Sequence, residues 1–295
     1  MLIRRGLYRI GAFIKHCLTA RNTGGHGVHS PYLFEWVRMV MSDKHNYYSW
    51  AAIEECREKL LHDDRELEFV DYGSGVRSRS LENGAGACGL AFRDERRVRD
   101  IARGSLAKKK YAQMLYRLVN WLGTSHGLEN GIRTAYSLEF RGLTIVELGT
   151  SLGVTTAYLA AVDSRNRVLT YEGCESVAQV AQENWKSLGL SNICCHVGEI
   201  DVDVLGRDLG CVDVAFIDAN HTYAGTRAYF NMLADKVHEK SVIVVDDIHH
   251  SEEMERAWKE IGGDERVTST MDLYQMGLVF FDPHYWRRNY RMRLK

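Results

Sequence analysis

The second half of the chain alternates short apolar runs with amphipathic stretches, starting near residue 143. Apolar runs occupy residues 143–148, 167–172, 192–197, 212–218 and 241–247, and helical patterns lie between them at 155–162, 175–188, 222–237 and 251–261. This alternation predicts βαβ units and a parallel sheet covered by helices on both faces. Two further runs, 267–273 and 277–281, are too close together for a crossover helix and predict an antiparallel hairpin at one edge. We therefore expect an α/β fold with a doubly wound, mostly parallel, seven-stranded sheet.

The first half of the chain shows helical spacing instead, which predicts a helical N-terminal extension. Apolar residues recur at this spacing at Ile3, Leu7, Ile10, Ile14 and Cys17. The helical pattern continues over residues 33–61, a glycine-rich charged stretch from Asp71 to about Arg99 predicts a loop, and Ser105 is a suitable N-cap for a helix over 106–119. We assign residues 1–125 to a cap or substrate region and residues 126–295 to the α/β domain.

Composition and charge narrow the class of protein. The 295 residues include 38 Lys and Arg against 39 Asp and Glu, and this near-neutral balance gives no strong nucleic-acid signal. The seven cysteines have no disulfide-like spacing and read as reduced thiols, which favours a soluble cytoplasmic protein.

The charges are distributed unevenly along the chain. No acid precedes Glu35, and five basic residues follow the last acid, Asp282. A basic amphipathic N-terminal helix can lie weakly on an anionic membrane surface. We give more weight to the simpler alternative, in which its apolar stripe packs on the rest of the protein.

Candidate chemistry lies where the predicted strands end, because open α/β sheets bind ligands beyond the carboxyl ends of their strands. The first strand ends at Glu147 and leads into a turn with Gly149 and Gly153, which allow the backbone to approach a ligand closely. The second strand ends at Glu172, whose carboxylate can accept hydrogen bonds from both hydroxyls of a ribose. The spacing E-x-G-x-x-x-G differs from the dinucleotide signature, and its leading carboxylate suits a cationic ligand better than a phosphate.

These motifs resemble those of class I S-adenosylmethionine (SAM)-dependent methyltransferases, over about residues 107–283. The resemblance implies that Glu147, Gly149, Thr150, Ser151 and Gly153 hold the methionine end of SAM, that Glu172 and Gly173 hold the ribose, and that Gly198, Glu199 and Ile200 contact the adenine. The stretch 25–31 and the segment around Asp71 resemble an N-terminal extension in uncharacterised bacterial methyltransferase-like proteins.

Three further carboxylates, Asp218, Asp246 and Asp247, close the fourth and fifth predicted strands. Carboxylates that converge repel one another unless they are protonated or bridged by a cation, and oxygen-rich sites suit Mg²⁺. The pattern resembles metal-dependent O-methyltransferases, which implies that these three residues bind the metal and that Asp218 lies beside the cofactor and the reaction. The general base would be His221, at a position where catechol-type enzymes have Lys, with His249 or His250 as alternatives. The alternative to a metal site is that Asp246 or Asp247 only caps the following helix.

Two other readings remain open. The turn also matches G-x-S-x-G, the nucleophile elbow of α/β-hydrolases, with Ser151 as nucleophile, Asp218 or Asp246 as the acid and His249 as the base. A scaffold that binds SAM without turnover is the second reading. The glycines near Asp71 look like another cofactor loop, but no helix follows, and we interpret them as structural.

We expect SAM-dependent methyl transfer to a hydroxyl oxygen of a small molecule, with Mg²⁺ as the candidate metal. A homodimer is compatible with the sequence, although no residue pattern specifies the oligomeric state.

Overall fold

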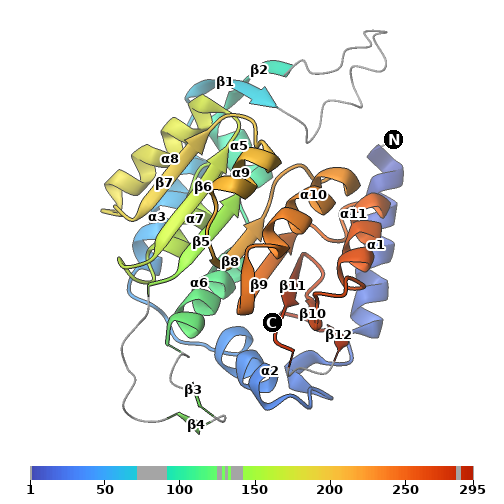
Figure 1. The fold of residues 1–295 in the computed structure, drawn as a ribbon. Helices are drawn as coiled ribbons and strands as arrows, with labels where there is room; N and C mark the ends of the chain where they lie inside the picture. The colour runs from blue at the N-terminus through green and yellow to red at the C-terminus, as the bar shows by residue number, and fades with distance from the viewer. Residues whose placement is uncertain are drawn as a thin grey trace.

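The central element is a mixed sheet of eight strands in the order β12-β10-β11-β9-β8-β5-β6-β7 (Figure 1). The computed structural model describes residues 2–71, 92–124, 128–129, 132–133, 142–283 and 287–294. The strands of this sheet are β5 (Thr144–Leu148), β6 (Arg167–Glu172), β7 (Ile193–Val197), β8 (Val212–Ile217), β9 (Val237–Asp246), β10 (Ser269–Asp272), β11 (Met276–Phe280) and β12 (Arg288–Arg291). β7, β6, β5, β8 and β9 are parallel neighbours, which confirms the predicted doubly wound sheet.

The C-terminal side of the sheet contains one strand more than the sequence predicts. β11 pairs antiparallel with both β9 and β10, as expected for the predicted hairpin. β12 then pairs in parallel with β10 and takes the edge position. Seven strands were expected because the basic residues 287–293 resemble a solvated tail.

Helices cover both faces because the inner strands are apolar on both sides. β8 and residues 241–246 of β9 are buried throughout. The helices are α5 (Val98–Ser105), α6 (Lys109–Thr124), α7 (Val154–Ala160), α8 (Glu175–Ser187), α9 (Val202–Asp208), α10 (Tyr223–Ala234) and α11 (Glu252–Ile261). Val146 and Val245 pack with residues of α9, α10 and α11, whereas Ile145 and Val244 pack with α6 on the opposite face.

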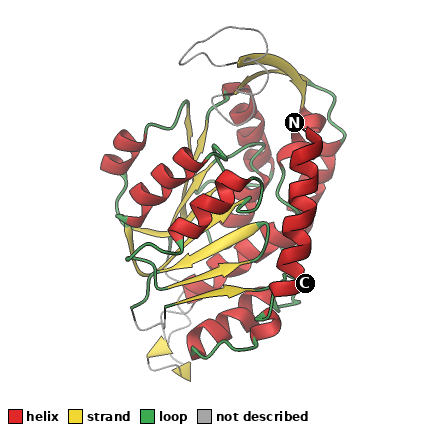
Figure 2. Cartoon of the chain, turned by 90° about the vertical axis from the view of Figure 1, so that its right-hand side faces the viewer, coloured by secondary structure: helices red, strands yellow, loops and turns green. Residues whose placement is uncertain are grey.

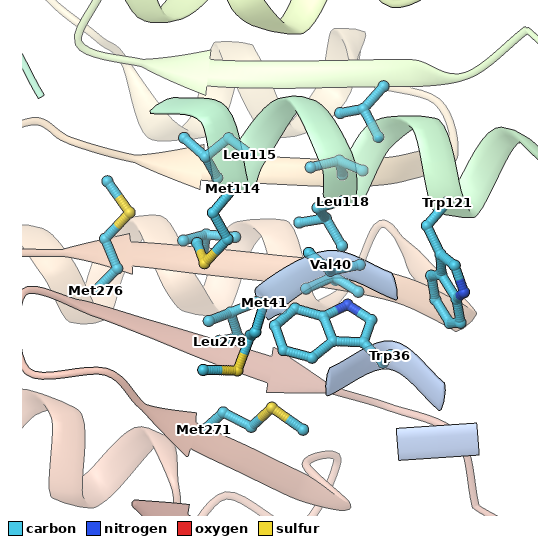
Figure 3. Packing of buried hydrophobic residues seen from close by; sticks show 14 of the residues in the cluster. Trp36, Val40, Met41, Met114, Leu115, Leu118, Trp121, Met271, Met276 and Leu278 are labelled. Carbon is cyan, nitrogen blue, oxygen red and sulfur yellow. The ribbon is translucent and has the colours of Figure 1, made fainter. Parts of the chain in front are cut away.

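The N-terminal region consists of α1 (Leu2–Thr19), η1 (Thr23–Gly25), α2 (Pro31–Trp36), the π-helical turn η2 (Val37–Met41) and α3 (Trp50–Leu61). Residues 42–49 interrupt the single helical stretch predicted over 33–61. Trp36, Val40 and Met41 pack between α6 and the strands β10 and β11 (Figure 3). The N-terminal residues therefore share a hydrophobic core with the α/β residues, which places them directly on the sheet.

Two predictions for residues 66–124 are wrong. β1 (Glu66–Asp71) and β2 (Phe92–Arg97) form an antiparallel hairpin where part of a loop was expected, and the glycines at 73–89 lie outside the described residues. Ser105 ends α5 and does not cap α6, which begins at Lys109. A further short pair, β3 (Leu128–Glu129) and β4 (Ile132–Arg133), follows α6.

Helix α1 lies along the outside of the molecule beside α11 (Figures 1 and 2). The face of α1 that docks on the protein is polar, since the Tyr8 hydroxyl donates to Glu255 and the buried His16 contacts Asp272. The predicted docking stripe is wrong for Ile10 and Ile14, which are 60% and 53% exposed. No helix in the described part of the chain is long and apolar enough to span a membrane.

Candidate functional site

The candidate site lies where the strand order reverses. β6 and β7 lie on one side of β5, and β8 and β9 lie on the other, so the strand order reverses between β5 and β8. Open α/β sheets bind ligands beyond the carboxyl ends of the strands at such a point. The predicted turn occupies this position, with Gly149 at φ +99° and Gly153 at φ +77°. A Cβ at Gly149 would collide with the Asp218 carbonyl, and one at Gly153 would lie 2.5 Å from Trp185 Nε1. Glycine is required at both positions by conformation and by space.

Glu172 supports the same turn from the end of the neighbouring strand. Its Oε2 accepts a hydrogen bond from the Ser151 amide at 2.7 Å, and its Oε1 accepts one from the Cys174 amide at 3.0 Å. These two bonds fix the carboxylate at the end of β6, directly beside the turn. Ser151 has φ +49°, a left-handed conformation that is uncommon without glycine, and the bond to Glu172 stabilises it.

Glu147 lies beneath the turn and is completely buried. Its Oε2 accepts hydrogen bonds from Thr156 Oγ1 at 2.5 Å and Thr170 Oγ1 at 2.7 Å, while Oε1 is buried and has no partner in the described part of the chain. Burial raises the pKa of Glu147 to about 7, although the two threonine hydroxyls act in the opposite direction. This carboxyl group therefore lies at the turn but is held by protein groups, which the sequence did not indicate.

The two threonines that hold Glu147 were missed, although one of them carried a usable signal. Thr170 is the register partner of Glu147 across β5 and β6. Aligning the ends of the predicted strands 143–148 and 167–172 places Glu147 opposite Tyr171, one position from its observed partner, so the alignment indicates only the neighbourhood of Thr170. Thr156 lies one helical turn into α7, where sequence spacing alone does not show that it turns back toward the strand.

The loop after β7 has the positions assigned to the adenine. The Gly198 amide donates to the backbone carbonyl of Glu172 at 2.8 Å, so this loop lies next to Glu172. Glu199 is exposed, and Ile200 packs partly against the core. The structure thus brings the segments around Gly149, Glu172 and Gly198 together along one edge.

The acidic residues after β8 and β9 converge as expected. Asp218 and Asp246 share a side-chain hydrogen bond. Burial and the neighbouring carboxylates raise the pKa of Asp218 well above its usual value, and burial also raises that of Asp246. One proton shared between the two carboxyl groups follows from this arrangement. Asp246 Oδ1 is buried and has no hydrogen-bond partner among the described residues.

Asp247 differs from its two neighbours because it lies among histidines. Burial alone would raise its pKa, but the nearby imidazoles of His250 and His221 lower it overall. His250 Nδ1 lies 3.3 Å from Asp247 Oδ2. Asp247 also has φ +53°, and Asn220 after β8 has φ +48°. Together with Ser151 after β5, residues with positive φ therefore follow three of the strands at this site. Such strained backbone conformations cluster at functional sites.

Of the three histidines considered as a base, His221 and His250 lie at the carboxylates, and His221 is the one next to Asp218. Its Nε2 is 3.6 Å from Asp218 Oδ1, and its ring stacks on His250 with centroids 6.1 Å apart. Burial lowers the pKa of His221, which favours the neutral form that can accept a proton.

His249 points elsewhere and belongs to a separate ionic cluster. Asp272 accepts from His249 Nε2 at 3.0 Å and from Arg291 Nε at 3.0 Å, and it lies 3.2 Å from His16 Nδ1. The Tyr274 amide also donates to it at 2.9 Å. Both oxygens of Asp272 are therefore engaged by protein donors, so the cluster is better explained as an anchor for α1 than as a cation site.

The arrangement does not assemble a hydrolase triad among the described residues. Ser151 Oγ shares a hydrogen bond of 2.6 Å with Ser105 Oγ, and His249 pairs with Asp272. A serine nucleophile requires a base within hydrogen-bond reach.

Comparisons with known proteins agree with this geometry. A family model described as a methyltransferase domain matches residues 146–248. The S-adenosylhomocysteine (SAH)-bound methyltransferase PaMTH1 from Podospora anserina is similar with a TM-score of 0.51 and 11% identity, over 86% of this chain and 96% of that chain. The O-methyltransferase from Bacillus cereus in complex with SAH has a TM-score of 0.49 and 16% identity, over 84% and 97% of the two chains. The O-methyltransferase TomG from Streptomyces achromogenes, in complex with SAM, has a TM-score of 0.48 and 18% identity, over 62% and 86%.

No curated protein matches the chain in sequence. The fold is nevertheless defined by three agreeing observations: the strand order, the family match over residues 146–248 and the similarity to PaMTH1 over most of both chains. Residues 146–248 thus match a methyltransferase-domain model, and the chain has the α/β fold seen in the methyltransferase PaMTH1.

Proposed function

We propose that this protein transfers the methyl group of SAM to a hydroxyl oxygen of a small-molecule acceptor. The observation that carries the proposal is the convergence of two sites on neighbouring strand ends. One is the turn of Gly149 and Gly153 with Glu172 beside it, and the other is the carboxylate cluster of Asp218, Asp246 and Asp247. The first suits a cationic nucleoside, and the second suits the activation of an oxygen nucleophile.

SAM supplies an electrophilic methyl group on a positively charged sulfur. Glu172 would hold the ribose hydroxyls, because its carboxylate is fixed beside the turn by the Ser151 and Cys174 amides and carboxylate oxygens accept hydrogen bonds from hydroxyl groups. Gly149 and Gly153, with Thr150 and Ser151 between them, would let the backbone lie close to the methionine part. Glu147 lies beneath the turn, and its ionised carboxylate would attract the positively charged sulfur of SAM. This ionised form is accessible at neutral pH, because the pKa of Glu147 is about 7.

The residues after β8 and β9 fit a divalent cation. The donors are carboxylate oxygens, which hard cations prefer, and Asp246 Oδ1 is buried with no hydrogen-bond partner among the residues that the structure describes. Mg²⁺ bound there would lower the pKa of an acceptor hydroxyl. The binding residues would be Asp218, Asp246 and Asp247, whose mutual repulsion a cation would relieve.

His221 would take the proton of the acceptor hydroxyl on its neutral imidazole. The acceptor oxygen then forms the new bond to the methyl carbon, and the sulfur–methyl bond breaks with its electron pair left on sulfur. The products are the methylated acceptor and neutral SAH, so atoms and charge balance. The protein contributes by holding the acceptor in line and excluding water.

Isothermal titration calorimetry tests the cofactor half of the proposal. We expect SAM and SAH to bind with 1:1 stoichiometry, and Glu172→Gln to weaken SAH binding by about 10- to 100-fold, because hydrogen bonds to a charged group contribute roughly 1.5–3 kcal/mol. Glu175→Gln is the matched control, since Glu175 is exposed at the start of α8. Absence of binding by the unmodified chain would refute the proposal, and labelling of Ser151 by a fluorophosphonate would support the hydrolase reading instead.

SAH formation with a panel of hydroxylated acceptors tests the transfer half. EDTA is expected to abolish turnover and Mg²⁺ to restore it. Turnover that resists EDTA would remove the metal from the proposal without affecting SAM binding. SAM binding without turnover on any acceptor would favour a scaffold.

A further inference from the structure

Helix α1 has a docked side that is polar rather than apolar. The Tyr8 hydroxyl donates to Glu255, and His16 Nε2 lies 2.9 Å from the Met292 carbonyl oxygen. The Arg9 carbonyl accepts from the Tyr274 hydroxyl at 2.8 Å. These contacts fix α1 on α11, on the loop after β10 and on the segment after β12. Phe13 adds one apolar contact at the edge of this side, because its ring packs on Tyr274 with centroids 5.0 Å apart, but half of its side chain remains exposed.

The opposite side of α1 presents apolar residues to solvent. Ile10, Phe13, Ile14 and Leu18 are exposed by 60%, 50%, 53% and 79%. They are four of the nine large apolar side chains that are exposed among the described residues, and they lie within nine consecutive positions. With 3.6 residues per turn, they form one continuous face. Figure 2 shows α1 on the outer surface of the molecule, with this helix unobstructed along its length.

Basic residues border this apolar face. At 3.6 residues per turn, the exposed Arg9 falls on one border and the exposed Lys15 on the other. Arg291 Nη1 donates to Thr19 Oγ1 at 2.6 Å and the Arg293 amide donates to Thr23 Oγ1 at 3.0 Å, which brings the basic C-terminal segment to the end of α1. The acids Glu255 and Asp272 contact α1 from its docked side, where Glu255 also pairs with Lys15 at 3.4 Å.

The charge pattern distinguishes between possible occupants of the face. A second copy would bring an identical helix without acidic residues against this one, and its basic residues would repel those of the first. An anionic lipid surface offers both an apolar interior and negative headgroups. Helices with an apolar face bordered by Lys and Arg lie in the plane of such surfaces.

We propose that α1 docks the protein on an anionic membrane surface, with Ile10, Phe13, Ile14 and Leu18 inserted at the level between headgroups and acyl chains. The basic residues that border the face, together with the C-terminal segment, contact the headgroups. The helix lies parallel to the membrane and remains fixed to the protein by its polar side. This inference does not depend on the proposed methyl transfer.

Co-sedimentation of the full chain with lipid vesicles tests this proposal. Vesicles of phosphatidylcholine alone are compared with vesicles that contain about 30% phosphatidylglycerol, at low salt and at about 0.5 M NaCl, where the Debye length is much shorter. We expect binding to the anionic vesicles, weakened by salt, and little binding to the neutral ones. The double variant Ile14→Glu/Leu18→Glu is expected to lose about tenfold or more in vesicle affinity, because it removes buried apolar area and adds negative charge.

Val204→Glu is the matched control, since Val204 is 43% exposed on α9, away from α1. Circular dichroism and thermal unfolding verify that each variant keeps its fold, and Leu18→Glu alone serves if the double variant does not fold. Anionic-vesicle binding that is absent, or equal in the Leu18→Glu and Val204→Glu variants, overturns the proposal. A dimer in size-exclusion chromatography that Leu18→Glu converts to a monomer also overturns it, in favour of a second copy.

Discussion

At the scale of single residues, the candidate site depends on carboxyl groups whose protonation is controlled by their surroundings. Glu172 is held by two backbone amides, Glu147 is buried under two threonines, and Asp218 shares a proton with Asp246. Burial penalises a charged carboxylate, whereas hydrogen bonds and cations favour it. A cationic cofactor and a divalent metal would stabilise the charged forms of the last three residues.

Glu147 makes a pH-dependent contribution to stability. Its pKa is raised to about 7 in the folded protein, so the folded state binds more protons than the unfolded state between the unfolded value and pH 7. The contribution is therefore favourable at low pH and is lost as pH rises through about 7, by at most about 3 kcal/mol. Chemical denaturation between about pH 5 and pH 8 measures how the free energy of unfolding depends on pH. We expect it to decrease less with rising pH in Glu147→Gln than in the wild type. Equal slopes in the two proteins would contradict the raised pKa.

Asp218 is expected to matter for the metal more than for the fold. Asp218→Asn replaces the Asp218 carboxyl group by an amide. The amide can still donate a hydrogen bond to Asp246, so the contact between the two residues is preserved, but a cation ligand is lost. In wild-type protein, Mg²⁺ at about ten times its Kd would stabilise the fold by about 1.4 kcal/mol. Thermal unfolding should show this stabilisation in the wild type and in the exposed-residue control Asp203→Asn, but not in Asp218→Asn. An unchanged Mg²⁺ effect in Asp218→Asn would exclude this residue as a ligand.

At the scale of elements, the turn between β5 and α7 is fixed by contacts with α8. Gly153 has φ +77°, and a Cβ there would lie 2.5 Å from Trp185 Nε1 and 2.8 Å from Ala181 Cβ. Gly189 has a similar φ of +69°, but a Cβ there would meet nothing within 4 Å. An alanine at Gly189 would therefore suffer backbone strain only, whereas an alanine at Gly153 would also clash with α8.

Gly189→Ala is expected to reduce the free energy of unfolding by about 1 kcal/mol, which is the cost of a left-handed alanine. Gly153→Ala adds a steric clash in a packed region and is expected to cost about 1–3 kcal/mol more. Urea denaturation measures both. Equal losses in the two variants would show that α8 does not constrain the turn. SAH affinity is expected to fall in Gly153→Ala only.

At the scale of the whole molecule, the sequence predicted the strands of the parallel sheet because each is a continuous apolar run. β6 begins and ends where predicted, at Arg167 and Glu172. The β1–β2 hairpin and β12 were missed because at least half of the residues in each of these strands are charged, so none of them is a continuous apolar run. The position of β12 depends on its pairing with β10, which local sequence does not encode.

The candidate site was predicted in outline for the same reason. Residues that end parallel strands meet at one edge, so Gly149, Glu172 and Asp218 come together once the strands are known. Contacts set by packing were not predictable, such as Thr156 on Glu147. The docked side of α1 was also missed, because its anchor Asp272 is 256 residues from His16 and the docked side chains are polar.

The most direct test of the central claim is a crystal structure of the full chain soaked with SAH. We expect electron density for a nucleoside beyond the ends of β5 and β6, with both ribose hydroxyls within hydrogen-bond distance of the Glu172 carboxylate and the sulfur beside the Gly149–Gly153 turn. Density for the nucleoside at any other place, or a ribose that does not contact Glu172, would contradict the assignment of this site.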